Sequence, residues 1–126
     1  MVITINAGSP VPIYSQLKRQ IILAIVDNDL EEGYQLPSVR QLAGDLDINM
    51  HTVNKAYKLL ANDGFIQISK KKGAFVALDY DLLRVTYSAN GLIEDLALYL
   101  KLYKRIYGSL GPIRQLIDNL EVDHDR

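Results

Sequence analysis

Two groups of side chains in this sequence are suited to binding phosphates and base edges. The first group lies at the start of a helical pattern and is mostly short and polar: Asn49, Met50, His51, Thr52 and Asn54. The second is a run of three lysines closed by a glycine: Lys70, Lys71, Lys72 and Gly73. Amide, hydroxyl and imidazole groups can hydrogen-bond to base edges, and ammonium groups attract phosphate. These residue types therefore indicate the binding of phosphates and base edges.

Residues 38–63 predict the pair of helices that would position the first group. A short helix is indicated by apolar residues on one stripe, preceded by Ser38 as its cap: Val39, Leu42, Ala43 and Leu46. Asn49 can cap the next helix, which ends before Gly64. Two helices with so short a connection are typical of a helix-turn-helix, whose second helix begins in the DNA major groove. An αα-corner in a small helical core accounts for the same pattern, and both interpretations are open at this point.

The three lysines are expected at the tip of a β-hairpin. Strand-forming residues flank them on both sides: Phe65, Ile66 and Ile68 before, and Ala74, Phe75, Val76 and Leu78 after. A hairpin that directly follows a helix-turn-helix would be a wing, with its lysines against the DNA backbone. A solvated hairpin tip, in which lysines keep a sheet edge soluble, is the alternative.

Composition limits the class of protein. The net charge of the 126 residues is −1, but five lysines and one aspartate give residues 49–73 a local charge of +4. No cysteine is present, which excludes disulfides and thiolate metal sites and fits a reducing cytoplasm. The sequence shows no phosphate-binding glycine loop, catalytic cluster, signal peptide or membrane span. We expect a cytoplasmic protein that is not an enzyme and has no cofactor, no metal and no membrane partner.

Helical patterns flank this region on both sides. The first helix should run from Ile13 to the neighbourhood of Asp27–Asp29, buried from two directions because Ile22, Leu23 and Val26 add a second apolar side. A boundary is expected at Asp79, which separates a domain 1–79 from a helical region 80–126. Whether residues 80–107 form one helix or two is open. A last short helix should begin at Pro112, and the polar tail 121–126 should be frayed.

The C-terminal helices carry more apolar surface than so short a region can bury by itself. A second copy of the chain is the simplest cover, so we expect a homodimer. Its predicted interface consists of apolar and aromatic residues at helical spacing: Leu92, Leu96, Tyr99, Leu100, Tyr103, Ile106, Tyr107, Ile113, Leu116 and Ile117.

Four motifs together resemble the DNA-binding domain of the GntR family of bacterial transcription regulators. They are Pro-Ile-Tyr at residues 12–14, Leu-Pro-Ser-Val-Arg at 36–40, Thr-Val-Asn-Lys-Ala-Tyr at 52–57 and Gly-Ala-Phe-Val at 73–76. The resemblance implies a winged helix-turn-helix. The short helical remainder resembles the YtrA-type subgroup, which implies dimerisation by that region and repression of a nearby, often transport, operon.

The resemblance also assigns roles to residues. It implies that Arg40 reaches phosphate or base, although pairing with Asp45 or Asp47 is the alternative. Two positions depart from the family pattern: Met50, where arginine or proline is common, and Lys71, where glycine is common. Met50 cannot donate a bidentate hydrogen bond to guanine. The predicted DNA-binding residues are Ser38, Arg40, Asn49, Met50, His51, Thr52, Asn54, Lys55, Lys58, Lys70, Lys71, Lys72 and Gly73.

These observations predict a mainly α fold with a small β-hairpin: a winged helix-turn-helix domain followed by a short C-terminal helical dimerisation region. The predicted function is a dimeric repressor that binds an inverted repeat in double-stranded DNA. The alternative is a winged-helix protein-interaction module without DNA specificity. A third hypothesis adds a small-molecule effector, of unidentified chemistry, between the C-terminal helices.

Overall fold

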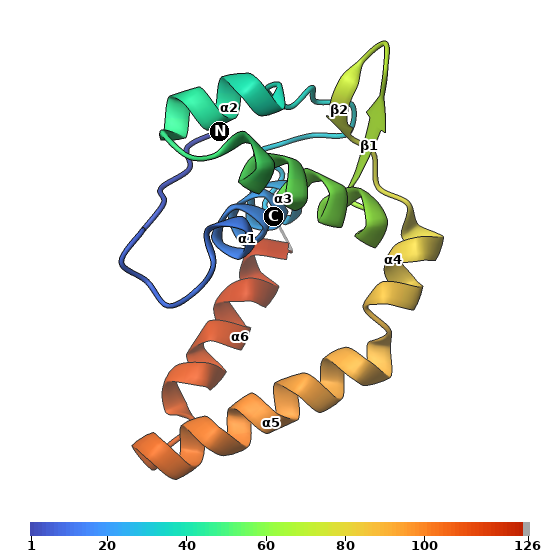
Figure 1. Ribbon diagram of the computed structural model, residues 1–126. Coiled ribbons are helices and arrows are strands. Elements are labelled where there is room, and N and C mark those ends of the chain that lie inside the picture. The colour runs from blue at the N-terminus through green and yellow to red at the C-terminus, as the bar shows by residue number, and fades with distance from the viewer. Residues whose placement is uncertain (125–126) are drawn as a thin grey trace. The chain divides into compact units, whose positions relative to one another are not determined.

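The computed structural model describes residues 1–124, which divide into two compact units, the first Met1–Thr86 and the second beginning at Tyr87. The first unit contains four helices and one antiparallel hairpin: α1 (Ile13–Val26), α2 (Val39–Leu46), α3 (Met50–Asp63), β1 (Ile66–Ser69), β2 (Gly73–Val76) and α4 (Tyr80–Thr86). The second contains α5 (Ala89–Tyr107) and α6 (Gly111–His124). The predicted fold class, mainly helical with a small hairpin, is confirmed (Figure 1).

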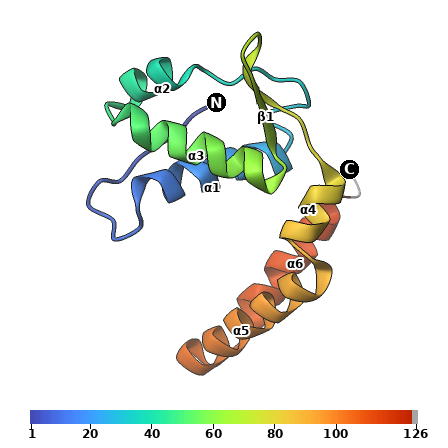
Figure 2. The ribbon, with the colours of Figure 1, turned by 45° about the vertical axis from the view of Figure 1, so that its right-hand side comes forward.

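Helix α3 is the centre of the first unit, where it lies between α1 and α2 (Figures 1 and 2). Its inner side packs four buried residues against both neighbours: Val53, Ala56, Tyr57 and Leu60. Helix α1 contributes Leu17, Ile21 and Ile25 to the same core. Full burial of each large apolar side chain stabilises the fold by roughly 1.5–3 kcal/mol. The exposed start of α3 is thus held by a packed core behind it.

Local signals explain why α2 and α3 begin and end where they do. The Ser38 hydroxyl oxygen accepts a 3.0 Å hydrogen bond from the amide of Gln41 and caps α2. Asn49 Oδ1 accepts a 2.8 Å bond from the amide of His51 and caps α3. Gly64 ends α3 at φ +103°, a conformation that L side chains rarely adopt. Both predicted caps are confirmed.

The second apolar side of α1 is only partly covered, because Ile22 is half-buried while Leu23 and Val26 are exposed; the prediction that this helix is buried from two directions is therefore wrong for the single chain. Leu23 is 46% exposed and Val26 is 59% exposed. Helix α3 packs against the stripe of α1 that contains Leu17, Ile21 and Ile25, and these are the buried residues of α1.

The hairpin pairs β1 and β2 from Ile66 opposite Val76 to Ser69 opposite Gly73. The segment before α2 adds to this sheet, since Gln35 forms an antiparallel bridge with Phe75. The amide of Leu36 also donates to the carbonyl of Ala74 at 2.8 Å. The hairpin is therefore held from the side by the chain that leads into α2.

Helix α4 packs with the first unit, so the compact division falls after Thr86 and not at Asp79. Asp79 joins α4 to this unit because its amide donates to the Gly64 carbonyl at 2.9 Å and its Oδ1 accepts from the amide of Leu82 at 3.1 Å. Residues 80–107 form two helices, because Ser88 caps a new helix by accepting from the amide of Gly91.

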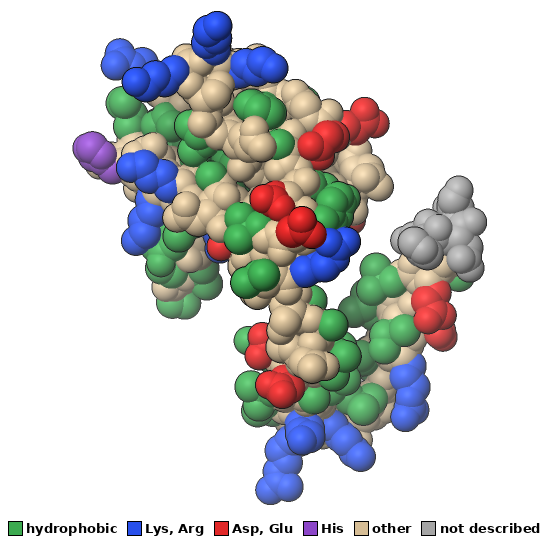
Figure 3. Space-filling view, turned by 90° about the vertical axis from the view of Figure 1, so that its right-hand side faces the viewer, with side chains coloured by type: hydrophobic (Ala, Val, Ile, Leu, Met, Phe, Trp, Pro, Cys, Tyr) green, Lys and Arg blue, Asp and Glu red, His purple; other side chains and the backbone are tan. Residues whose placement is uncertain are grey.

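In the second unit, α5 and α6 expose most of their apolar residues. None of the α5 residues is buried, and Tyr99, Ile106 and Tyr107 are each about two thirds exposed. Hydrophobic side chains are visible along these helices in Figure 3. Helix α6 continues through residues 121–124, so the prediction of a frayed tail is wrong there; residues 125–126 lie outside the described chain.

Candidate nucleic-acid interface

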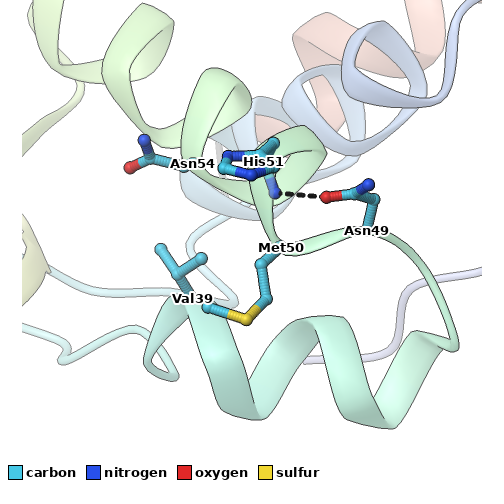
Figure 4. Close-up of a pocket in the computed structure, with 5 residues that line it drawn as sticks. All are labelled: Val39, Asn49, Met50, His51 and Asn54. Atoms are coloured by element: carbon cyan, nitrogen blue, oxygen red, sulfur yellow. Dashed lines mark hydrogen bonds between the residues drawn. The ribbon is translucent and has the colours of Figure 1, made fainter.

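The start of α3 forms one wall of a hollow whose other wall is the start of α2. Its lining residues come from both helices (Figure 4): Val39, Asn49, Met50, His51 and Asn54. The Met50 side chain points toward α2, beside Val39, and is 44% exposed. The structure therefore brings together four of the polar and apolar residues that the sequence placed at the start of the second helix.

Asn49 caps α3 and also has hydrogen-bond donors that can face a ligand. Its Oδ1 atom is occupied by the amide of His51 at 2.8 Å, which leaves the Nδ2 hydrogens as the donors that can face a ligand. An Asn amide whose oxygen is held in this way is fixed in orientation, and its two N–H groups can donate to an acceptor on a base or phosphate. The cap thus restricts what Asn49 can recognise.

Three other predicted residues of α3 do not line this hollow: Thr52, Lys55 and Lys58. Thr52 is half-buried and Lys58 is exposed. The ammonium nitrogen of Lys55 lies 3.9 Å from the centre of the Tyr14 ring on α1, within the range of a cation–π interaction. No pattern in the sequence predicts this pair, although Tyr14 belongs to the Pro-Ile-Tyr motif. The Tyr14 ring restricts the positions that the Lys55 ammonium group adopts.

Ser38 and Arg40 lie at the start of α2. Arg40 is exposed and forms no ion pair within residues 1–124, so its predicted alternative, pairing with Asp45 or Asp47, does not occur in this structure. Ser38 accepts from Gln41 while its hydroxyl hydrogen remains a donor. Both side chains are available to an anionic ligand.

Lys70, Lys71 and Lys72 form the loop between β1 and β2, as predicted. The Ser69 hydroxyl accepts a 2.9 Å bond from the amide of Lys72, and Gly73 has φ +68°. The Lys72 ammonium lies 5.7 Å from the centre of the Phe75 ring. Lys and Arg side chains gather at the hairpin end of the first unit (Figure 3). The tip is a compact cationic loop.

Tyr57 connects α3 to the segment before α2. Its hydroxyl donates a 2.7 Å hydrogen bond to the carbonyl of Pro37, and the residue is 2% exposed. Burial raises the pKa of the Tyr57 phenol, with a smaller contribution from Tyr34. Tyr57 therefore stays neutral and acts as a hydrogen-bond donor inside the core.

The whole predicted DNA-binding set belongs to the first unit, and the predicted dimer-interface residues belong to the second. Donors dominate the first set: amides, hydroxyls, one guanidinium and several ammonium groups. Within residues 1–124, no three His, Cys, Asp or Glu side chains are grouped to hold a metal. The same part of the chain contains no helix long and apolar enough to cross a bilayer. The arrangement suits an anionic, hydrogen-bonding ligand.

Comparison with known sequences assigns most of the first unit to one family. A sequence model described as bacterial regulatory proteins, gntR family, matches residues 13–76. The HTH-type transcriptional repressor YtrA of Bacillus subtilis (strain 168) is 36% identical over 75 residues, which make up 60% of this chain and 58% of that protein. The match thus spans less than two thirds of that relative's length.

Solved structures extend the likeness to nearly the whole chain. A transcriptional antiterminator from Listeria monocytogenes EGD-e is 31% identical with a TM-score of 0.79, over 96% of this chain and 90% of that chain. YtrA from Sulfolobus acidocaldarius, a GntR-family transcription factor, is 39% identical with a TM-score of 0.60, over 77% and 99%. The DNA-binding domain of AraR in complex with operator ORX1 shares the fold, at 23% identity and a TM-score of 0.55, over 61% and 99%.

Proposed function

The chain belongs to the GntR family of bacterial regulatory proteins, and we propose that it is a sequence-specific DNA-binding transcription regulator. The motif-based assignment to that family is thereby confirmed, and two YtrA relatives support the YtrA-type subgroup. The proposal rests on the observation that one unit contains three DNA-compatible features. They are the capped helix α3, Arg40, which forms no ion pair in the described chain, and the hairpin with lysines at its tip. Each presents donors that DNA can satisfy.

The start of α3 is the element that enters the major groove in this proposal. Asn49, His51 and Asn54 would face base edges, while Met50 would contact a thymine methyl group. Arg40, Thr52, Lys55, Lys58 and the wing lysines would bind phosphates and fix the register. The AraR domain, which has the same fold, is bound to an operator, and this supports a DNA-binding role for the fold.

The second unit supplies the dimer contact in this proposal. Its apolar residues are exposed on both helices, including Leu96 at 54% and Tyr99 at 66% on α5 and Leu116 at 52% on α6. Apolar side chains exposed at this density on two neighbouring helices are typical of an interaction surface. A twofold dimer would present two recognition helices to the two halves of an inverted repeat.

Repression is the regulatory outcome that we propose, because YtrA of Bacillus subtilis is a repressor. A protein that occupies a promoter excludes the polymerase without any catalytic group. A nearby transport operon is the proposed target, from the YtrA-type resemblance, and the cytoplasm is the proposed location. An effector between the C-terminal helices would act by changing the distance between the two recognition helices.

Salt-dependent binding of Arg40→Ala and the wild type tests the proposal. Wild-type protein should bind random DNA at low salt and release it as salt rises, because each neutralised phosphate releases a counterion. Loss of one phosphate contact in Arg40→Ala should make the slope of log K against log salt shallower by about 0.9. Gln41→Ala is the matched control on the same helix, since the Gln41 backbone amide, which Ser38 caps, is unchanged.

The rival function, a protein-interaction module, gives a different result in the same experiment. Such a module would show no retention on DNA at low salt and no effect of Arg40→Ala. Unchanged affinity in Arg40→Ala alone, with salt-dependent binding intact, would remove Arg40 from the interface but leave DNA binding in place.

A further inference from the structure

The wing is connected to the rest of the first unit by a side chain that no motif singled out. The Gln35 side-chain nitrogen Nε2 donates a 2.7 Å hydrogen bond to the backbone carbonyl of Lys72, 37 residues farther along the chain. We propose that Gln35 is a positioning residue that holds the lysine tip in a fixed orientation relative to α2 and α3. The inference rests on the proposed DNA-binding function.

The backbone around Gln35 fixes where its side chain can reach. Residues 33–36 run antiparallel to β2: the Gly33 amide donates to the Val76 carbonyl at 2.7 Å, and the Val76 amide donates to the Tyr34 carbonyl at 2.8 Å. Gln35 itself is bridged to Phe75. This segment therefore cannot slide along the hairpin, and the Gln35 amide reaches the tip at one place only.

The contact from Gln35 adds to the pairing that closes the tip, where Ser69 lies opposite Gly73. A two-stranded hairpin by itself is only marginally stable in water. Within the tip loop, the Lys72 amide donates to the Ser69 hydroxyl at 2.9 Å. A Cβ atom at Gly73 would lie 3.8 Å from Gln35 Nε2, so the amide also packs beside the residue that closes the loop.

The other end of the same segment is anchored to the DNA-facing helices. The carbonyl of Pro37 accepts the hydroxyl hydrogen of Tyr57 on α3, and Ser38 caps α2. Wing tip, α2 and α3 are thus joined through six consecutive residues, 33–38. Preorganising the lysines in this way would lower the entropy lost when they bind phosphates. A purely structural bond would stabilise the hairpin and leave DNA affinity unchanged.

Two variants remove the contact, and one matched variant keeps it. Gln35→Ala deletes the donor, and Gln35→Glu replaces it with an acceptor that faces the Lys72 carbonyl. Both should fold, since Gln35 is exposed and its backbone pairing is unchanged. Gln67→Ala is the control, because Gln67 is an exposed glutamine on β1 of the same hairpin, opposite Phe75.

DNA affinity should be measured for each variant in two backgrounds, the wild type and a triple variant with Lys70→Ala, Lys71→Ala and Lys72→Ala. Gln35→Ala should weaken binding about two- to tenfold in the wild type, the range expected for loss of one hydrogen bond. It should have no effect in the triple variant. Equal loss in both backgrounds, or no loss in the wild type relative to Gln67→Ala, would overturn the proposal.

A measurement without DNA tests the same contact. Backbone amide order parameters from NMR should fall for residues 70–73 in Gln35→Ala and stay unchanged in Gln67→Ala. Unchanged values in Gln35→Ala would mean that the bond does not hold the tip, and the proposal would fail whatever the DNA affinity. A wild type that binds no DNA would instead overturn the proposed function itself.

Discussion

The Tyr57 hydroxyl donates a 2.7 Å hydrogen bond to the backbone carbonyl of Pro37. The two residues belong to the recognition helix and to the segment that leads into α2, and the phenol is almost completely buried. The predicted DNA-binding residues on α2 and on α3 are therefore connected to each other by a hydrogen bond inside the core. The stability of the first unit therefore depends on this internal hydrogen bond as well as on apolar packing.

Tyr57→Phe should lower the free energy of unfolding by about 1 kcal/mol, because it removes the hydrogen bond and leaves the Pro37 carbonyl without that donor. Chemical denaturation monitored by circular dichroism measures the loss. Tyr80→Phe is the control, since Tyr80 is 58% exposed and removal of its hydroxyl should change little. Equal stability of Tyr57→Phe and the wild type would show that the bond contributes nothing net.

The raised pKa of Tyr57 also predicts a pH dependence. Burial keeps Tyr57 protonated in the folded state above the ordinary tyrosine pKa of about 10, where the unfolded chain has lost the proton. Its contribution is therefore fully present below about pH 10 and is lost as the pH rises toward the folded pKa. The free energy of unfolding of the wild type should fall more steeply above pH 10 than that of Tyr57→Phe. Parallel curves in urea titrations at pH 9–11 would contradict the assignment.

Substitutions at Asn49 should separate capping from recognition. Asn49→Ser keeps an oxygen that can cap α3 but loses the amide donors, so stability should be retained while the preferred DNA sequence changes. Asn49→Ala should also lower stability by about 1 kcal/mol, since an N-cap is lost. Thermal denaturation and competition binding with variant operators measure the two effects. An unchanged sequence preference in Asn49→Ser would mean that Asn49 caps α3 but does not contribute to sequence recognition.

A charge in the exposed stripe of α5 should prevent dimerisation. Tyr99→Asp would bury a carboxylate against apolar residues of the second copy, which is costly unless it is paired. The expected result in analytical ultracentrifugation is a dimer for the wild type and a monomer for the variant, with the helix content of the first unit retained. Glu94→Gln is a control on the same helix, outside the predicted stripe. A Tyr99→Asp variant that remains dimeric would place the contact elsewhere.

Much of the first unit could be predicted because its signals are local. Ser38 and Asn49 are caps that any helix start of this kind uses, and the lysine run between strand-forming residues indicates a hairpin by itself. The bond from Gln35 to Lys72 could not be predicted, since it joins distant residues through a segment with no strand periodicity. Nor could the cation–π pair of Lys55 and Tyr14, which depends on how α1 and α3 cross.

The second unit was predicted less completely. Apolar spacing identified the helices but gave their limits poorly, because a polar tail such as Glu121–His124 continues a helix or frays with little difference in local signal.

Helix α1 of the first unit shows a related limit. Apolar periodicity identified its second apolar side, with Leu23 and Val26, but could not show whether another part of the protein covers that side.

In the proposed function, two copies of this chain read the two halves of an inverted DNA repeat. Selection of bound sequences from a random DNA pool by the full chain measures half-site sequence and spacing together. Enrichment of an inverted repeat by the wild type, with a shifted half-site for Asn49→Ser, is the predicted result. A pool that stays random after repeated rounds, or that enriches a single half-site without symmetry, would contradict the claim.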